Sequence, residues 1–299
     1  MDYEMDVFKK KQIVILIAIV AIFLLLTPAP CFAIVVHIDQ TPADKPHDNV
    51  LGRWGTNASC VMISGNEVLT TRHQGGGVGT TVQIGGVDYL VDEVTNIGLA
   101  DLRIAVLTTT EGDPISLTNY VSLYSTTNET NKTGILAGFG MGRGATLYTG
   151  GDPYGYEWSG SDNTTQRWGA NKVNGTSTVE DTYTSDVIYG DFDGIDEGDY
   201  VTYEAAPATW DSGGGWFIDI ANEWYVAGII RAVEHSGETW YRNSADPDIL
   251  DPDTFDAVRI SSYYDDIVAA MQPVPEPATV CLLGLGALFF RKNRLRPPA

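Results

Sequence analysis

The chain has 299 residues, of which 43% are hydrophobic and 19% are charged, with 39 Asp and Glu against 18 Lys and Arg. Without the two apolar terminal segments, residues 1–33 and 274–299, 11 basic and 35 acidic residues remain, a net charge of −24. A surface this acidic repels nucleic acid and anionic lipid and suits a solvated extracellular protein, so we expect no nucleic-acid partner.

Residues 1–33 predict a secretory signal peptide. Three lysines (9–11) precede an apolar run, Ile13 to Leu26, and the segment ends at Cys31-Phe32-Ala33. This layout is typical of a signal that signal peptidase removes, which makes Ile34 the new N-terminus. The alternative is an uncleaved anchor, although the apolar run is shorter than the roughly 20 residues that span a bilayer.

The middle of the chain predicts an all-β domain. It is rich in Gly, Thr, Val and Tyr, with turn signals every 8–12 residues. Residues 61–71 indicate two strands around Ser64-Gly65-Asn66, and residues 80–94 a hairpin turning at Gly85-Gly86. Residues 215–230 indicate a third hairpin turning at Ala221-Asn222-Glu223.

Two further segments complete the expected elements. Residues 150–185 are polar and rich in Asn, Thr and Gly, which predicts loops with short strands. Residues 261–271 predict one helix, with Ser262 as its N-cap and acidic residues in its first turn. Cys60 is the single cysteine between the terminal segments, so the domain depends on its core, for which about 240 residues suffice.

The C-terminal segment, 273–299, has three parts in order: Pro275-Glu276-Pro277, an apolar stretch from 278 to 290, and a basic tail with Arg291, Lys292 and Arg294. It resembles the PEP-CTERM sorting signal of bacterial exopolysaccharide-associated proteins. The resemblance implies processing by an exosortase, transient membrane association through a transmembrane helix, and a place on the outer surface or in the matrix of a Gram-negative-type bacterium. An ordinary C-terminal anchor, the alternative, has no need of Pro-Glu-Pro.

Three residues in the middle of the chain form a candidate catalytic set. His73 follows the strand pattern VLTT, Asp101 begins the apolar run ADLRIAVL, and Ser212 lies in WDSGG. A serine hydroxyl needs a neighbouring imidazole to take its proton, and a carboxylate fixes the tautomer of that imidazole. The order His, Asp, Ser is that of the chymotrypsin-type proteases and differs from that of the subtilisins and α/β-hydrolases.

Five separated segments resemble the trypsin/chymotrypsin family of serine proteases: VLTTRH (68–73), ADLRIAVL (100–107), GILAGFG (134–140), WDSGG (210–214) and DAVRISSYYDDI (256–267). The resemblance implies an all-β fold of two six-stranded Greek-key barrels with a short C-terminal helix. The protease domain is then residues 34–272, with a first barrel at about 34–125 and a second at about 130–271.

The same resemblance implies an exported serine endopeptidase that cleaves a peptide or protein substrate without a cofactor or a metal. His73 is then the general base, Asp101 its orienting carboxylate and Ser212 the nucleophile. The backbone N–H groups of Trp210 and Ser212 are the expected oxyanion hole. The alternative is a catalytically weak or inactive protease-fold binding or matrix protein, and a purely structural surface protein is a third hypothesis.

The chain departs from the family pattern at three places. Trp210 stands where the family usually has glycine, and Arg231-Ala232-Val233 stands where it usually has Ser-Trp-Gly. Six residues before the nucleophile, Ala206 replaces the aspartate of the trypsin branch, so we do not expect trypsin-like cleavage. Glu204 supplies a charge there only if the loop is offset.

Cleavage after Ala33 exposes Ile-Val at the new N-terminus. In the family, such a terminus inserts into the domain and its α-amino group pairs with the aspartate before the catalytic serine, here Asp211. Signal peptidase itself then creates the activating terminus. The alternative is that Ile34 begins an ordinary strand.

One acidic cluster stands apart from these motifs. It lies in GDFDGIDEGD (190–199), where hard oxygen ligands at this spacing can hold calcium, although the stretch does not follow the EF-hand pattern. The sequence favours a solvated acidic turn over a calcium site. The carboxylates concerned are Asp191, Asp193, Asp196, Glu197 and Asp199.

Overall fold

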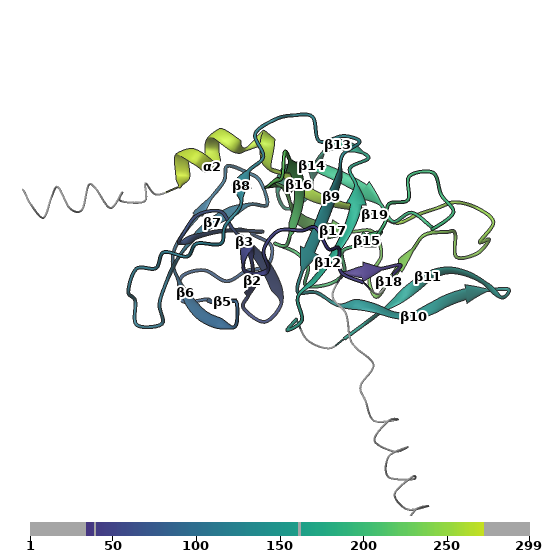
Figure 1. Ribbon diagram of the computed structural model, residues 1–299, viewed down its shortest axis with the longest axis horizontal. Coiled ribbons are helices and arrows are strands. Elements are labelled where there is room, and N and C mark those ends of the chain that lie inside the picture. Colours follow the sequence, from purple (N-terminus) through teal and green to yellow (C-terminus); the bar gives the residue numbers. More distant parts are fainter. Residues whose placement is uncertain (1–33, 39, 161–162, 272–299) are drawn as a thin grey trace, which may run out of the picture.

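The structure is a computed structural model that describes residues 34–38, 40–160 and 163–271. Figure 1 shows two β-rich lobes side by side, the first in purple and blue and the second in teal and green. The predicted signal peptide and C-terminal sorting segment, with its expected transmembrane helix, lie outside the described residues. Within the described ranges, no helix combines the length and the apolar character needed to cross a membrane.

The first lobe is a closed barrel of six antiparallel strands. Around the barrel their order is β2-β3-β4-β7-β6-β5, so the fourth strand of the barrel, β5, returns to lie beside the first, β2, which is the Greek-key arrangement. A 3-10 turn, η1 (Asp48–Val50), leads into the barrel. The strands are β2 (Leu51–Trp54), β3 (Ala58–Met62), β4 (Glu67–Thr70), β5 (Thr81–Ile84), β6 (Val87–Asn96) and β7 (Arg103–Thr108).

The second lobe repeats this strand order. Its sheet runs β12-β9-β16-β17-β19-β14-β13, and its two ends, β12 and β13, are consecutive parts of one bent chain segment. The sheet therefore curves back on itself as a second barrel with six strand positions. Its strands are β9 (Thr133–Gly138), β12 (Arg167–Lys172), β13 (Gly175–Glu180), β14 (Thr184–Asp191), β16 (Gly215–Ile220), β17 (Glu223–Val233) and β19 (Thr254–Arg259). The fold is thus the all-β, chymotrypsin-like double barrel.

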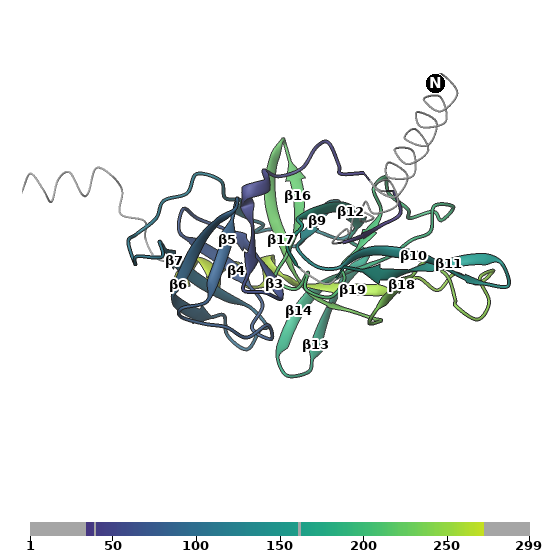
Figure 2. The ribbon, with the colours of Figure 1, turned by 90° about the horizontal axis from the view of Figure 1, so that it is seen from below.

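Smaller sheets extend the second barrel. β10 (Gly142–Thr149), β11 (Asp152–Ser159) and β18 (Glu238–Trp240) form a three-stranded sheet that projects beyond it (Figure 2). Two short strands, β1 (Val35–Val36) and β15 (Ala205–Ala206), pair with each other and bring the start of the described chain against the second barrel. β8 (Ser122–Leu123) runs parallel to β17.

The predicted hairpins are confirmed, and two local predictions are corrected. The turns at 64–66, 85–86 and 221–222 join β3 to β4, β5 to β6 and β16 to β17. Residues 150–185 contain more strand than the sequence predicts, because exposed polar strands such as β13 lack the apolar alternation that marks a half-buried strand.

The C-terminal helix is shorter than predicted and begins later. β19 leads directly into a 3-10 turn, η2 (Ile260–Ser262), which is followed by α2 (Tyr264–Ala270). Ser262 therefore lies in the 3-10 turn and is not the N-cap, which is Tyr263 without a side-chain capping bond. Ile267 anchors the helix in the core, where it is fully buried.

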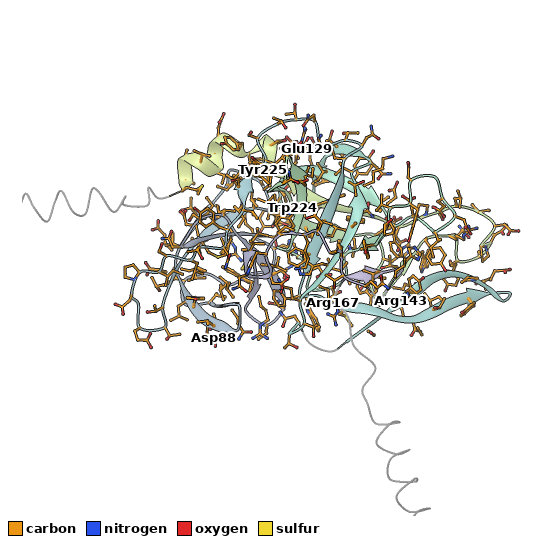
Figure 3. The ribbon with its side chains drawn as sticks, in the orientation of Figure 1. Asp88, Glu129, Arg143, Arg167, Trp224 and Tyr225 are labelled. Carbon is orange, nitrogen blue, oxygen red and sulfur yellow. The ribbon has the colours of Figure 1, made fainter. Side chains whose placement is uncertain are left out.

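Three apolar clusters form the core, one of them around Trp216 and Phe255 of the second barrel. One fills the first barrel and includes Cys60, whose thiol pKa is raised by complete burial. Another joins the barrels, since it combines Leu69 of β4 with Phe217 of β16. The linker between the barrels is fixed by buried Glu129, labelled in Figure 3. Its carboxylate accepts two hydrogen bonds from Arg259 at 3.0 and 2.7 Å.

Gly213, at the contact between the barrels, has no room for a side chain. Its φ is 84°, in the left-handed region that favours glycine. A Cβ there would overlap the carbonyl oxygen of Ser59 in β3 and the hydroxyl of Thr70 in β4. The loop before β16 therefore lies directly against the first barrel.

We predict that Gly213→Ala lowers the free energy of unfolding by about 2–4 kcal/mol, because it combines a left-handed backbone with overpacking. Gly77→Ala is the matched control, since no atom lies within 4 Å of a Cβ at Gly77 and its φ is not left-handed. Denaturant unfolding of both variants measures the difference. Equal stabilities would contradict this packing of the loop.

Candidate active site

His73 and Asp101 lie together at one end of the first barrel. β4 and β7 are antiparallel neighbours, with Thr70 opposite Arg103. The segment that follows β4 therefore meets the segment that precedes β7. The Nδ1 atom of His73 lies 2.5 Å from Oδ2 of Asp101, whose side chain is 3% exposed against 36% for the imidazole.

The Asp101 carboxylate is held by several hydrogen bonds. Its Oδ1 accepts the backbone N–H groups of Arg72 at 2.8 Å and His73 at 2.9 Å, while its own N–H donates to Oγ of Ser185 at 2.9 Å. An ionised carboxylate beside Nδ1 favours the tautomer with hydrogen on Nδ1 and a lone pair on Nε2. This is the tautomer of a general base.

Ser212 lies on a loop that packs against the strand leading to His73. Its carbonyl accepts the N–H of Ser59 at 2.9 Å, and the carbonyl of Ser59 accepts the hydroxyl of Thr70 at 2.8 Å. Thr70 is three residues before His73. Ser59 of β3 thus links the serine loop of the second barrel to β4, the strand that ends near the histidine.

The hydroxyl of Ser212 does not hydrogen-bond to His73 in this structure. It donates instead to the carbonyl of Arg231 at 3.3 Å. The Nε2 atom of His73 lies 2.6 Å from the side-chain amide nitrogen of Gln74. With Nδ1 protonated, that amide donates to the Nε2 lone pair that would otherwise accept the serine proton.

The two N–H groups proposed from the sequence as an oxyanion hole are unoccupied by protein acceptors. Neither Trp210 N–H nor Ser212 N–H donates to any of the described residues. The carbonyl of Trp210 accepts the hydroxyl of Ser59 at 3.3 Å, which fixes the orientation of the loop. Trp210 has a φ of 77°, a left-handed angle that costs a non-glycine residue about 1–2 kcal/mol.

Asp211, between those two residues, is a fully buried carboxylate. It accepts N–H bonds from Gly140 at 2.7 Å, Ala208 at 2.9 Å and Ile34 at 3.3 Å. Burial raises its pKa to about 7, although these donors act in the opposite direction. A Cβ at Gly138 or Gly140 would overlap the carboxylate, so both positions need glycine.

Ala206, at the position that sets specificity in the resemblance, is buried and pairs with Val35 of β1. A small space beside it, also lined by Val233, His235 and Phe255, does not admit a water molecule. Glu204 supplies no charge there. It is fully buried, and its carboxylate accepts hydrogen bonds from Asn171 and from the Val201 N–H.

The sequence missed several residues of this region. Ser59, Gln74 and Ser185 contact the predicted site residues directly. Ser59 and Ser185 lie 153 and 84 positions from their partners Ser212 and Asp101, so no local pattern indicates these contacts. In the described part of the chain, no group of three or more His, Cys, Asp or Glu residues could hold a metal ion.

Comparison with known proteins adds the following. Residues 273–294 match the family model of the PEP-CTERM protein-sorting motif. No curated protein matches the chain. Among the solved structures that match is the Rv3671c protease in its inactive form, with 13% sequence identity and a TM-score of 0.46, covering 75% of this chain and 90% of that one.

The left-handed angle at position 210 reverses the usual stability order of a glycine and an alanine substitution. In most positions Ala is more stable than Gly, but at a φ of 77° we predict that Trp210→Gly is more stable than Trp210→Ala by about 1 kcal/mol. Both variants remove the indole, so its lost contacts cancel in the comparison. Denaturant unfolding gives the difference, and a more stable Ala variant would rule out the left-handed conformation.

Proposed function

We propose that this protein is an exported serine endopeptidase in which His73, Asp101 and Ser212 hydrolyse peptide bonds through a covalent acyl-enzyme. The observation that carries the proposal is the 2.5 Å contact between His73 Nδ1 and the buried Asp101 carboxylate. The loop with Ser212 packs beside the strand that leads to this pair, which supports its role as the nucleophile.

In the proposed reaction, Oγ of Ser212 forms a bond to the carbonyl carbon of the substrate as Nε2 of His73 takes the hydroxyl proton. The tetrahedral intermediate then loses its amine, which leaves with the proton from Nε2. Water attacks the acyl-enzyme by the same route, returns a proton through His73 and releases the acid. Asp101 stabilises the imidazolium in both steps without taking the proton.

The N–H groups of Trp210 and Ser212 would bind the oxygen that becomes negative in the intermediate. An oxyanion-hole donor commonly contributes about 3 kcal/mol, because it is already oriented before the charge develops. The left-handed backbone at Trp210 supports this assignment, since strained angles cluster at functional sites.

We further propose that removal of the signal peptide activates the enzyme. In the uncleaved chain Ile34 has a φ of 54°, which a β-branched residue disfavours, whereas a chain beginning at Ile34 has no φ to satisfy. Its α-amino group would lie beside the buried carboxylate of Asp211, whose Oδ2 is 3.3 Å from the Ile34 nitrogen. The charged pair would fix the segment that carries Trp210 and Ser212.

The sorting motif indicates export and cell-surface sorting in a bacterium, with processing by an exosortase. We propose a Gram-negative-type envelope, a mature protease domain over residues 34–272 and transient membrane association of the C-terminal segment during sorting. The final place is then the outer surface or the extracellular matrix. The substrate would be a peptide or protein.

Specific observations favour a second candidate, a protease-fold binding or matrix protein with weak or no turnover. The Ser212 hydroxyl donates to Arg231, and the Gln74 amide contacts His73 Nε2. Hydrolysis requires both of these side-chain contacts to change. The two functions therefore differ in these side-chain positions.

A fluorophosphonate probe distinguishes the candidates, because it labels only an activated serine. We predict labelling of the protein that begins at Ile34, complete loss in Ser212→Ala, and a rate at least about 10³-fold lower in His73→Ala. Ser177→Ala, an exposed serine of β13, is the control and should label normally. A folded protein that resists the probe would support the binding protein.

Extra residues before Ile34 test the activation step. A chain with three additional residues should label about 100-fold more slowly or worse, because breaking a buried ion pair commonly costs about 3–5 kcal/mol. Its fold should be retained in circular dichroism. The comparison is with the chain that begins at Ile34, and equal rates for the two would exclude activation by the free terminus.

A further inference from the structure

The loop between β14 and β15, residues 192–204, is rich in hydrogen-bond acceptors and poor in donors. It contains four of the five acidic residues of the cluster noted in the sequence, since Asp191 ends β14, and it contacts His37, which follows β1. Asp199 pairs with Lys172 at 2.6 Å at the surface. Within the described residues, no lysine or arginine forms an ion pair with Asp193, Glu197 or Glu204.

Two carboxylate oxygens of this loop are buried without a hydrogen-bond donor. They are Oδ2 of Asp193, whose residue is only 7% exposed, and Oε1 of Glu197. The two carboxyl groups contact each other. An unpaired buried carboxylate is costly, so the pair needs a positive charge between its members or a proton.

The surrounding polar groups cannot supply the missing donors. The single side-chain amide of Asn171 has two hydrogens but faces three acceptors, the carbonyls of Asp191 at 2.8 Å and Ala205 at 2.9 Å and Oε1 of Glu204 at 2.5 Å. The side-chain oxygens of Asn171 and Asn174 are also buried without donors. The region thus has more oxygen acceptors than hydrogens to satisfy them.

We propose that this loop binds a hard divalent cation of the size of calcium, with Asp193 Oδ2 and Glu197 Oε1 as its carboxylate ligands. Calcium takes six to eight oxygen ligands, including waters and neutral carbonyls, so two carboxylates suffice. The assignment rests on two carboxylates, because no group of three or more His, Cys, Asp or Glu residues that could hold a metal lies among the described residues.

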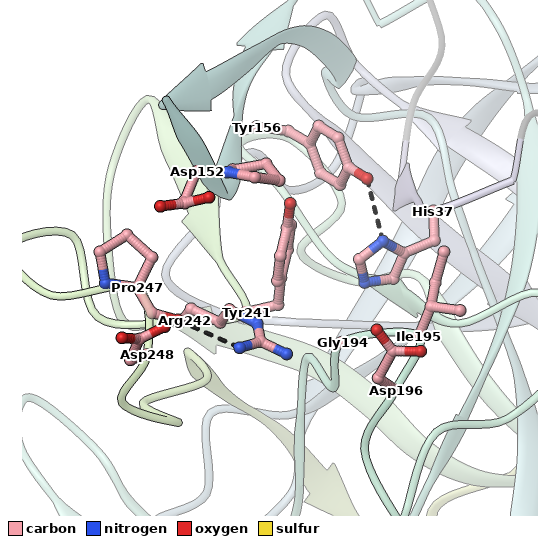
Figure 4. Close-up of a pocket in the computed structure, with 11 residues that line it drawn as sticks. His37, Asp152, Tyr156, Gly194, Ile195, Asp196, Tyr241, Arg242, Pro247 and Asp248 are labelled. Atoms are coloured by element: carbon pink, nitrogen blue, oxygen red, sulfur yellow. Dashed lines mark hydrogen bonds between the residues drawn. The ribbon is translucent and has the colours of Figure 1, made fainter. Parts of the chain in front are cut away.

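A cavity of about 370 Å³ gives the loop access to solvent. Figure 4 shows its lining, in which Gly194 and Asp196 of the loop face Asp152 and Asp248 across the opening. The carboxylates of Asp152 and Asp248 attract a cation toward the loop, and Arg242, the one arginine of the lining, donates to the carbonyl of Pro247.

The site is connected to the start of the described chain through His37. The imidazole Nε2 of His37 lies 2.8 Å from the carbonyl of Asp193, and the backbone N–H of His37 donates to the carbonyl of Glu204 at 3.1 Å. His37 is three residues from Ile34. A bound cation that orders the loop would therefore stabilise the position of Ile34 beside Asp211. The resulting effect on activity rests on the proposed function, but cation binding itself does not.

Calcium titration of the chelator-treated protein, by calorimetry and by thermal unfolding, tests the site. We expect one ion per chain and a melting temperature that rises with calcium, because a ligand of the native state stabilises it. Asp193→Asn and Glu197→Gln should each weaken binding at least about tenfold. Loss of a group that only supports a metal ligand commonly costs at least this much, and these two residues are ligands themselves. Magnesium should bind more weakly, since it demands a tighter octahedral shell.

Asp196→Asn is the matched control, because it removes the same charge from an exposed position of the same loop. It should retain the wild-type affinity. Absence of any calcium effect on the wild-type protein would overturn the proposal, as would equal losses in Asp196→Asn and Glu197→Gln. Glu197→Gln, at a partly exposed position, decides the matter if Asp193→Asn does not fold. Calcium binding by a protein that the fluorophosphonate does not label would support the calcium site and contradict only the proposed endopeptidase activity.

Discussion

The buried carboxylate of Asp211 is the contact on which the arrangement of the site depends. It accepts N–H groups from Ile34 and Gly140, which lie 177 and 71 positions away, and from Ala208 in its own loop. A carboxylate removed from water must be hydrogen-bonded, so displacing any of these segments leaves it unsatisfied. Because Trp210 and Ser212 are its chain neighbours, the backbone of the serine loop is determined by contacts made elsewhere.

The two barrels share one strand order, and their contact brings together candidate site residues from separate regions of the chain. His73 and Asp101 lie where neighbouring strands of the first barrel end and begin. Ser212 comes from the second barrel, and Ser59 binds the loop through both its backbone and its hydroxyl. A side chain at Gly213 would separate these parts, which explains the glycine next to the serine.

Local features of the sequence predicted the structure best. The hairpin at 80–94 was predictable because Gly85 and Gly86 both adopt the positive φ that its turn needs. Ser262 failed as an N-cap because β19 runs straight into a 3-10 turn, which capping preferences do not anticipate. Ser185 and Gln74 were not found, since the first contacts Asp101 from another barrel and the second has no distinctive residue type. The sequence identified Trp210 as unusual, but its left-handed angle required the structure.

The difference between a protease and an inactive relative is small at this site. The backbone of the serine loop is fixed by Asp211 and Ser59, and the tautomer of His73 by Asp101. Two contacts oppose catalysis, the bond of the Ser212 hydroxyl to Arg231 and the contact of the Gln74 amide with His73, and both are made by side chains, which move between staggered positions. Rotation about a single side-chain bond is far less demanding than a change of backbone. A substrate that displaces Gln74 and accepts a hydrogen bond from the free N–H groups would therefore favour the catalytic arrangement over the one observed.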